Sequence, residues 1–124
     1  MEKETIYGQI LGKANHYVAV PASNGGKRII KDEAMRAYER SFKEQCKVYA
    51  NRHINVPFTL TVDVYYSSCR YDLDNSLKTL LDCLQYCKAI TDDNLCTEIR
   101  AKKHIDRRLP RVEFGIMPMQ ENLF

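Results

Sequence analysis

Residues 58–66, FTLTVDVYY, and residues 75–88, NSLKTLLDCLQYCK, contain the two patterns that decide the fold. In the first, apolar and more polar side chains alternate, which predicts a strand with one buried face. In the second, apolar residues recur at intervals of three and four, which predicts a helix with one buried stripe. The stripe consists of Leu77, Leu80, Leu81, Leu84 and Cys87. A strand that leads directly into a helix favours an α/β domain.

The flanking segments extend this pattern on both sides. Apolar residues at helical spacing predict a helix over 32–51, and branched residues predict strands over 5–11 and 112–116. Residues 95–105 alternate as well, with Leu95, Ile99, Ala101 and Ile105 expected to point inward. Residues 12–28 are rich in turn-forming residues and are expected to form a loop. The resulting order predicts a small two-layer α/β domain with a mixed sheet and two main helices.

Length and composition limit the class of protein. The chain has 124 residues, 44% hydrophobic and 28% charged, which predicts one domain over 1–124 with a proper core and excludes a disordered or fibrous protein. No apolar run approaches the roughly 18 residues that cross a bilayer. The N-terminus, MEKETIYGQI, is too charged for a signal peptide. We therefore expect no membrane association and a cytoplasmic location.

Cysteine usage agrees with that location. The five cysteines are an odd number without a CxxC pair, which is typical of reduced thiols in a cytosolic protein. A zinc site would have to combine Cys83, Cys87, Cys96 and His104. Their spacing fits no usual zinc motif, so we do not expect zinc.

Charge is unevenly distributed along the chain. Residues 27–52 hold eight Lys and Arg against four Asp and Glu, and residues 94–111 hold six against two. Between them, residues 72–93 hold five Asp against two Lys. An acidic segment between two basic ones suits a metal-dependent site directed at phosphates. Ordinary solvated faces would give the same distribution, so charge alone leaves both interpretations open.

The acidic segment begins where the central strand leads into the second helix. Asp72 and Asp74 are two residues apart, so an extended backbone would place both carboxylates on one side. Lys78 lies one helical turn after Asp74. The pair Asp92-Asp93 opens the next strand and would close on the first pair if the two strands are neighbours.

Three carboxylates at one place need a counter-charge. Crowded carboxylates raise one another's pKa, and a divalent cation relieves that repulsion. Mg²⁺ prefers carboxylate and water oxygens, and it activates water for phosphodiester cleavage. The alternative is structural, because aspartates are common as helix caps and in turns and a Lys four residues away forms an ordinary ion pair.

At these residues the sequence resembles the RusA family of Holliday-junction resolvases, which phages and prophages often carry. The matching pattern is Asp72-Leu73-Asp74-Asn75, then Lys78, then Asp92-Asp93. The resemblance implies that Asp72, Asp74 and Asp93 are metal-binding catalytic carboxylates and that Lys78 is an essential lysine near the scissile phosphate. It also implies that Asp92 is less critical. It further implies a homodimer that uses Mg²⁺, with Mn²⁺ as a substitute, to nick two opposed strands of a four-way junction during recombination and repair.

The residues expected to bind DNA lie mostly outside this motif. Family members carry a dense Arg run before the Asp pair, whereas this chain has Ser67-Ser68-Cys69-Arg70-Tyr71. Either junction affinity is lower than in those members, or DNA contacts come from other basic residues. The candidates for DNA contact are Lys27, Arg28, Arg70, Lys102, Lys103, Arg107 and Arg108. The Gly25-Gly26 turn before Lys27 suits either a phosphate contact or a simple flexible turn. Among the tyrosines, only Tyr71 is a candidate for stacking on a base.

Three other functions remain open at this stage. The same fold and basic surface would serve a branched-DNA-binding protein without catalysis. A nuclease for flaps or other branched DNA would carry the same motif. An interaction protein would use its Asp pairs only as caps and turns, and its thermal stability would not change with Mg²⁺ or Mn²⁺.

Overall fold

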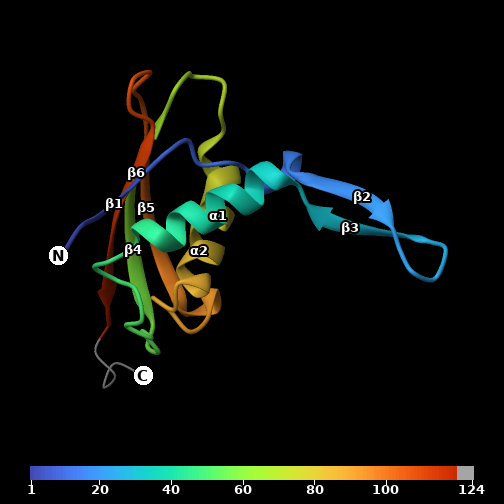
Figure 1. Cartoon of the computed structure of the whole chain (residues 1–124). Helices are drawn as coiled ribbons and strands as arrows, with labels where there is room; N and C mark the ends of the chain where they lie inside the picture. The colour runs from blue at the N-terminus through green and yellow to red at the C-terminus, as the bar shows by residue number, and fades with distance from the viewer. Residues whose placement is uncertain (120–124) are drawn as a thin grey trace.

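The computed structural model describes residues 1–119 and shows a sheet covered on one face by two helices (Figure 1). The sheet has the strand order β1-β6-β4-β5, and its strands are β1 (Glu4–Tyr7), β4 (Phe58–Tyr66), β5 (Cys96–Ile105) and β6 (Arg111–Pro118). Strand β4 pairs parallel with β5 and antiparallel with β6, so the sheet is mixed. The helices are α1 (Glu33–Gln45) and α2 (Leu73–Tyr86). The predicted two-layer α/β fold with two main helices is confirmed.

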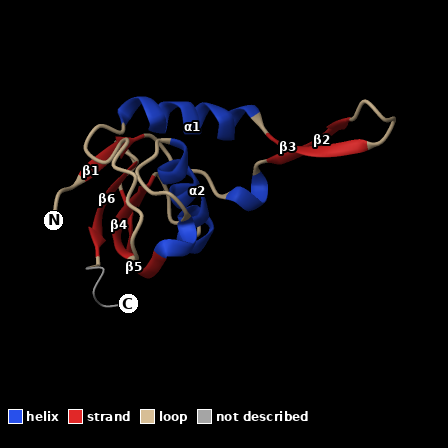
Figure 2. Cartoon of the chain, turned by 90° about the horizontal axis from the view of Figure 1, so that it is seen from below, coloured by secondary structure: helices blue, strands red, loops and turns tan. Residues whose placement is uncertain are grey.

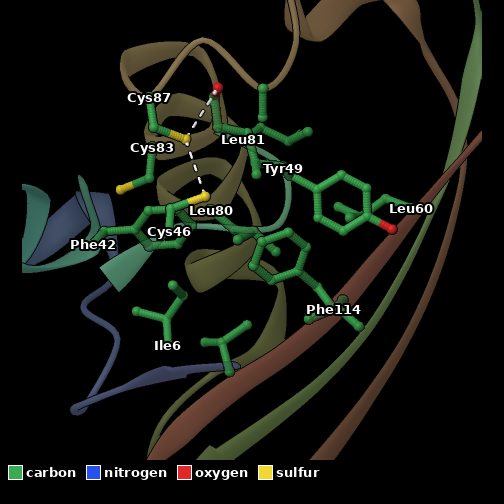
Figure 3. Close-up of a cluster of buried hydrophobic side chains, with 14 of the residues drawn as sticks. Ile6, Phe42, Cys46, Tyr49, Leu60, Leu80, Leu81, Cys83, Cys87 and Phe114 are labelled. Carbon is green, nitrogen blue, oxygen red and sulfur yellow. Dashed lines mark hydrogen bonds between the residues drawn. The ribbon is translucent and has the colours of Figure 1, made fainter. Parts of the chain in front are cut away.

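The core lies between the sheet and the two helices. Every second side chain of β4 is buried, as its alternation predicts, and these residues are Phe58, Leu60, Val62, Val64 and Tyr66. From α1, the ring of Phe42 stacks on Phe114 of β6 with ring centroids 6.0 Å apart. Leu80 and Leu84 of α2 complete the cluster, part of which Figure 3 shows. This packing fixes α2 above the sheet, with its first residues just beyond the end of β4.

The loop predicted over 12–28 is wrong, because most of this segment is a hairpin. A single 3₁₀ turn (Lys13–Asn15) leads into β2 (Tyr17–Pro21), which pairs antiparallel with β3 (Lys27–Lys31). Gly25 and Gly26 form the hairpin turn, where Gly25 has a positive φ of 86°. Figures 1 and 2 show the hairpin extending away from the sheet and the helices. The turn residues therefore predict a local reversal, and the branched residues on both sides form strands.

Other boundaries differ from the sequence-based prediction. Strand β1 ends at Tyr7 and not at residue 11, because Gly8 turns the chain with a φ of 114°. Helix α1 ends at Gln45 and not at residue 51. Beyond it, the buried carboxylate of Glu4 accepts hydrogen bonds from the backbone N–H groups of the next turn, which are those of Lys47, Val48 and Tyr49. A contact with the distant N-terminal strand therefore ends the helical pattern early.

Strand β5 is less buried than its sequence suggests. Ile99 and Ile105 were expected to point into the core, but they are 40% and 47% exposed. Because β5 is an edge strand of the sheet, it has a neighbouring strand on one side only. Among the described residues, no helix is long and apolar enough to span a membrane.

Candidate active site at the start of helix α2

Asp72 and Asp74 lie on the two sides of the first residue of α2. Asp72 is the N-cap residue, with an extended backbone and no side-chain cap hydrogen bond, and Asp74 is in the first turn. The expectation that both lie in one extended segment is wrong, because the helix begins at Leu73 and not at Asn75. Both aspartates are exposed. The positive end of the helix dipole favours a negative charge at both positions.

Tyr66, the last residue of β4, connects this helix start to the core. Its buried hydroxyl donates to the backbone oxygen of Asp72 at 3.2 Å and bonds with the Ser76 hydroxyl at 2.6 Å. Burial raises the pKa of Tyr66, and the negative charges of Asp72 and Asp74 raise it further. Both carboxylates thus lie within electrostatic reach of one hydroxyl. Within residues 1–119, neither forms an ion pair.

The loop before Asp72 is held from two sides. From β5, the Lys103 ammonium donates to the backbone oxygen of Cys69 at 2.8 Å and to that of Tyr71. From the other side, the Gln9 side-chain oxygen accepts the backbone N–H of Ser67 at 2.9 Å. The ring of Tyr71 lies parallel to that of Tyr66, with centroids 5.5 Å apart. These contacts fix the backbone that leads into Asp72.

Lys78 connects the acidic pair of the next segment to α2. Its ammonium lies 2.7 Å from a carboxylate oxygen of Asp93 and 3.1 Å from one of Asp82. The bond to Lys78 lowers the pKa of Asp93, and the same bond raises the pKa of Lys78. Asp92 has a different role, because its carboxylate accepts the backbone N–H of Asn94 and caps a short turn. Of the two adjacent aspartates, Asp93 alone contacts α2 through its side chain.

The structure does not bring Asp93 beside Asp72 and Asp74. Strands β4 and β5 are neighbours, as expected, but they run parallel, so the start of β5 lies beside the start of β4. Asp93 precedes β5, whereas Asp72 follows the far end of β4 (Figure 1). The backbone N–H of Asp93 donates to Gln85, eleven residues after Asp74 on α2, which is about 16 Å along the axis. Lys78 lies on α2 between Asp74 and Gln85, and its ammonium contacts Asp93.

Other carboxylates near α2 are also bound to lysines. Asp82 lies 2.8 Å from the Lys13 ammonium, and Glu39 of α1 lies 2.8 Å from that of Lys31. The Lys31 ammonium also donates to the hydroxyl of Tyr86 at 2.8 Å. These pairs hold the hairpin and the two helices together. Of the carboxylates on α2 and its N-cap, Asp72 and Asp74 are therefore the two that have no lysine or arginine partner within the described chain.

A small cleft of about 100 Å³ opens beside Asp72, between the start of α2 and the segment before the hairpin. Gly12, Asn15 and His16 line one wall, and Arg70, Asp72 and Asn75 are among the residues of the other. A Cβ atom on Gly12 would lie 2.4 Å from the Asn75 side-chain nitrogen, so this approach requires glycine. The sequence offers no local signal for Gly12 or His16, because they reach the site only through the tertiary fold.

The predicted DNA-binding residues fall into three groups. The first group lies at the same end of the sheet as Asp72 and consists of Arg70, Arg107 and Arg108. The backbone N–H of Asp106, which opens the β5–β6 turn, donates to the backbone oxygen of Tyr66 at the end of β4. Lys27 and Arg28 lie on the distant hairpin, next to its turn. Lys102 and Lys103 are adjacent on β5 and therefore point to opposite faces of the sheet.

The donor atoms at the start of α2 fit Mg²⁺. Among residues 1–119 no group of three or more His, Cys, Asp or Glu side chains is close enough to enclose a metal ion. Mg²⁺, however, is commonly held by only one or two carboxylates together with waters and substrate phosphates. Asp72 and Asp74 supply two exposed carboxylates, neither of which is neutralised by a lysine or arginine of the described chain. They match that donor set.

The comparisons with known proteins bear on the family to which this chain belongs. A search of curated proteins finds no match. The sequence model of the family described as endodeoxyribonuclease RusA matches residues 8–117, which include the Asp72–Lys78 motif and Asp93. Since this match covers most of the 124 residues, the chain belongs to the RusA family of endodeoxyribonucleases.

Proposed function

We propose that this protein is a Mg²⁺-dependent endodeoxyribonuclease that resolves four-way DNA junctions by paired, symmetric nicks during recombination and repair. Membership of the RusA family supports the class of reaction. The observation that carries the proposal is the contrast in charge along α2. Asp72 and Asp74 have no cation partner within the described chain, whereas Asp82 and Asp93 are bound to lysines.

In this proposal Asp72 and Asp74 hold the metal. A bound Mg²⁺ would supply a Lewis acid and a water of lowered pKa. The Tyr66 hydroxyl and the Lys103 ammonium fix the backbone on both sides of Asp72, so its carboxylate is pre-positioned. We propose Asp93 as a further catalytic residue that acts through Lys78, whose ammonium its carboxylate binds, and not as a ligand of this metal.

Lys78 is proposed to act on the scissile phosphate. Its side chain is 57% exposed, and the residue lies one helical turn after Asp74, with its ammonium bound to Asp82 and Asp93. A compact ammonium stabilises the negative charge that gathers on phosphoryl oxygens during cleavage. Because Lys78 is already held by Asp82 and Asp93, a phosphate would compete with these two carboxylates for it.

Basic side chains around the site are proposed to hold the DNA arms. Arg70, Arg107 and Arg108 lie at the end of the sheet that carries Asp72, and Lys27 and Arg28 on the hairpin extend the contact outward. Phosphate contacts of this kind weaken steeply with salt. A homodimer with two-fold symmetry would place two identical sites on the two opposed strands of a junction.

The proposal is tested with a labelled synthetic four-way junction, a linear duplex and a flap of the same sequence. The expected result is symmetric nicks in the junction with Mg²⁺ or Mn²⁺ and none with EDTA. Faster cleavage of the flap would make this a nuclease for other branched DNA. Tight junction binding without any nicks would make it a non-catalytic binding protein, and either result would contradict the proposed function.

A further inference from the structure

Two thiols meet where helices α1 and α2 end. Cys46 follows the last residue of α1, Cys87 follows the last residue of α2, and their Sγ atoms are 3.5 Å apart (Figure 3). The two residues are 41 positions apart in the sequence. The fold therefore brings together two cysteines from separate helices, and their sulfurs are already in contact.

A basic pocket opens over this pair. Its volume is about 480 Å³, and its lining includes both Cys46 and Cys87. Three lysines also line it, namely Lys43, Lys47 and Lys88, and none of them forms an ion pair within residues 1–119. Cys83 is buried close by but does not line the pocket. The pocket thus combines an unneutralised positive charge with two adjacent thiols at its base, where Cys46 is 2% and Cys87 is 5% exposed.

The two thiols differ in their surroundings. Cys46 donates to the buried carboxylate of Glu4 at 3.4 Å. The contact with Cys87, burial and the Glu4 charge all raise the pKa of Cys46. The Glu4 carboxylate contacts the Cys46 sulfur and disfavours a negative charge on it. Since thiolates are the attacking species in disulfide exchange, we assign Cys87 as the nucleophile and Cys46 as the thiol that reacts second.

We propose that this pocket admits a small anionic disulfide, of the class of oxidised glutathione, and that Cys87 and Cys46 exchange with it to form a protein disulfide. In the first step the Cys87 thiolate attacks one sulfur of the small disulfide, forms a mixed disulfide and releases one small thiolate. In the second, Cys46 loses its proton to solvent and attacks Cys87, and the second small thiolate leaves. The protein dithiol is oxidised by two electrons, and the small disulfide is reduced to two thiols.

The inference goes beyond the proposed nuclease function and is tested on the full chain without DNA. The protein is incubated with oxidised glutathione, quenched with acid and mapped as peptides without reduction. We expect a Cys46–Cys87 crosslink and a rise of about 10 °C in Tm, because the bond closes a long loop. Cys69, which is exposed, reports that the reagent is active. A map in which Cys69 is modified while Cys46 and Cys87 stay free would overturn the proposal.

Single substitutions test the order of the two steps. Cys46→Ala should trap glutathione on Cys87, whereas Cys87→Ala should leave Cys46 unmodified. Cys83→Ala is the matched control, because it removes a buried thiol outside the pocket and should leave the crosslink unchanged. If a variant at either position fails to fold, the rate at which each wild-type cysteine acquires glutathione gives the same order. Glutathione on Cys46 before Cys87, or a crosslink to Cys83, would contradict the assignment.

The role of the lysines is tested with two reagents. A triple variant, Lys43→Gln, Lys47→Gln and Lys88→Gln, should react about tenfold more slowly with oxidised glutathione, because the pocket loses its attraction for carboxylates. With the neutral reagent 2-hydroxyethyl disulfide, the variant and the wild type should react at equal rates. Equal rates with oxidised glutathione as well would show that the lysines do not recruit the oxidant.

Discussion

The carboxylates at the start of α2 and those further along the same helix differ in whether a lysine binds them. At the start, Asp72 and Asp74 are exposed and have no cation partner within residues 1–119. Further along, Asp82 is bound to Lys13 and Lys78, and Lys78 also holds Asp93. The helix dipole favours both charges at the start of α2, and no lysine or arginine of the described chain occupies them. The contrast therefore separates two carboxylates that are free to bind a ligand from carboxylates that are already bound to lysines.

The largest expected effect is on catalysis at the start of α2, where the carboxylates have no cation partner. Asp74→Asn should lower the rate of junction nicking about a thousandfold, because removing one electrostatic group from a catalytic site costs that order. Its free energy of unfolding should change by less than about 0.5 kcal/mol, since Asp74 is exposed and forms no ion pair. Nicking rates and urea unfolding measure the two quantities. A variant that nicks normally would remove Asp74 from the site.

A smaller effect is expected from the loop that precedes Asp72. Lys103→Gln removes the ammonium that binds the backbone oxygens of Cys69 and Tyr71, so the loop should lose its fixed position. We expect a fall of about tenfold in nicking rate, since misplacing a catalytic group weakens catalysis. Amide hydrogen exchange over residues 67–72 should become faster at the same time.

The adjacent Lys102 provides the control for that change. Its side chain points to the opposite face of the sheet and donates no hydrogen bond to this loop. Lys102→Gln should leave both the exchange rates and the nicking rate of bound junction unchanged. Equal behaviour of the two variants would show that Lys103 does not position Asp72.

Further along α2, where Asp82 is bound to lysines, the expected effect is on stability. Asp82→Asn removes the nearer carboxylate partner of Lys13 and one partner of Lys78, and both the Asp82 and Lys13 side chains are largely buried. We expect a loss of about 1 kcal/mol in the free energy of unfolding, measured with urea. Asp92→Asn is the matched control, because an asparagine oxygen still accepts the backbone N–H of Asn94. Equal losses in the two variants would contradict a structural role for the Asp82 pairs.

The smallest expected effect is on the titration of Asp93. Its bond to Lys78 lowers its pKa below the usual 3.8, so this pair stabilises the fold above the unfolded pKa. That stabilisation is lost as the pH falls through the lowered pKa of the folded state. In Lys78→Met the Asp93 pKa should return toward 3.8, which carboxyl ¹³C NMR between pH 6 and 2 would measure. An unchanged titration would mean that the ion pair does not form in solution.

Local patterns in the sequence are sufficient to predict the sheet layer and the helix layer of this fold. The alternation from Phe58 to Tyr66 and the stripe that includes Leu80 and Leu84 predict the central strand and α2 because each pattern reports a buried face. The sequence does not predict the hairpin, because turn-forming residues across 12–28 are equally typical of a long loop. The early end of α1 was missed because it depends on Glu4, which is more than 40 residues away in the sequence.

Part of the candidate site likewise follows from local sequence and part from tertiary contacts. Asp72, Asp74 and Lys78 lie in one short segment, so the sequence predicts that all three lie near the start of one helix. The separation of Asp93 follows from the parallel pairing of β4 with β5, which puts the two acidic segments at opposite ends of these strands. Gly12 and Lys103 reach the site through tertiary contacts alone. No local pattern in either segment signals that contact.

The most direct test of the contrast along α2 is the binding of Mn²⁺ to wild type, Asp74→Asn and Asp82→Asn. The free ion is followed by electron paramagnetic resonance in the presence of an uncleavable four-way junction, and binding to the junction alone is subtracted. We predict that Asp82→Asn binds Mn²⁺ as the wild type does and that Asp74→Asn binds it at least tenfold more weakly. Wild-type affinity in Asp74→Asn, or an equal loss in both variants, would contradict the assignment of the metal to the start of α2.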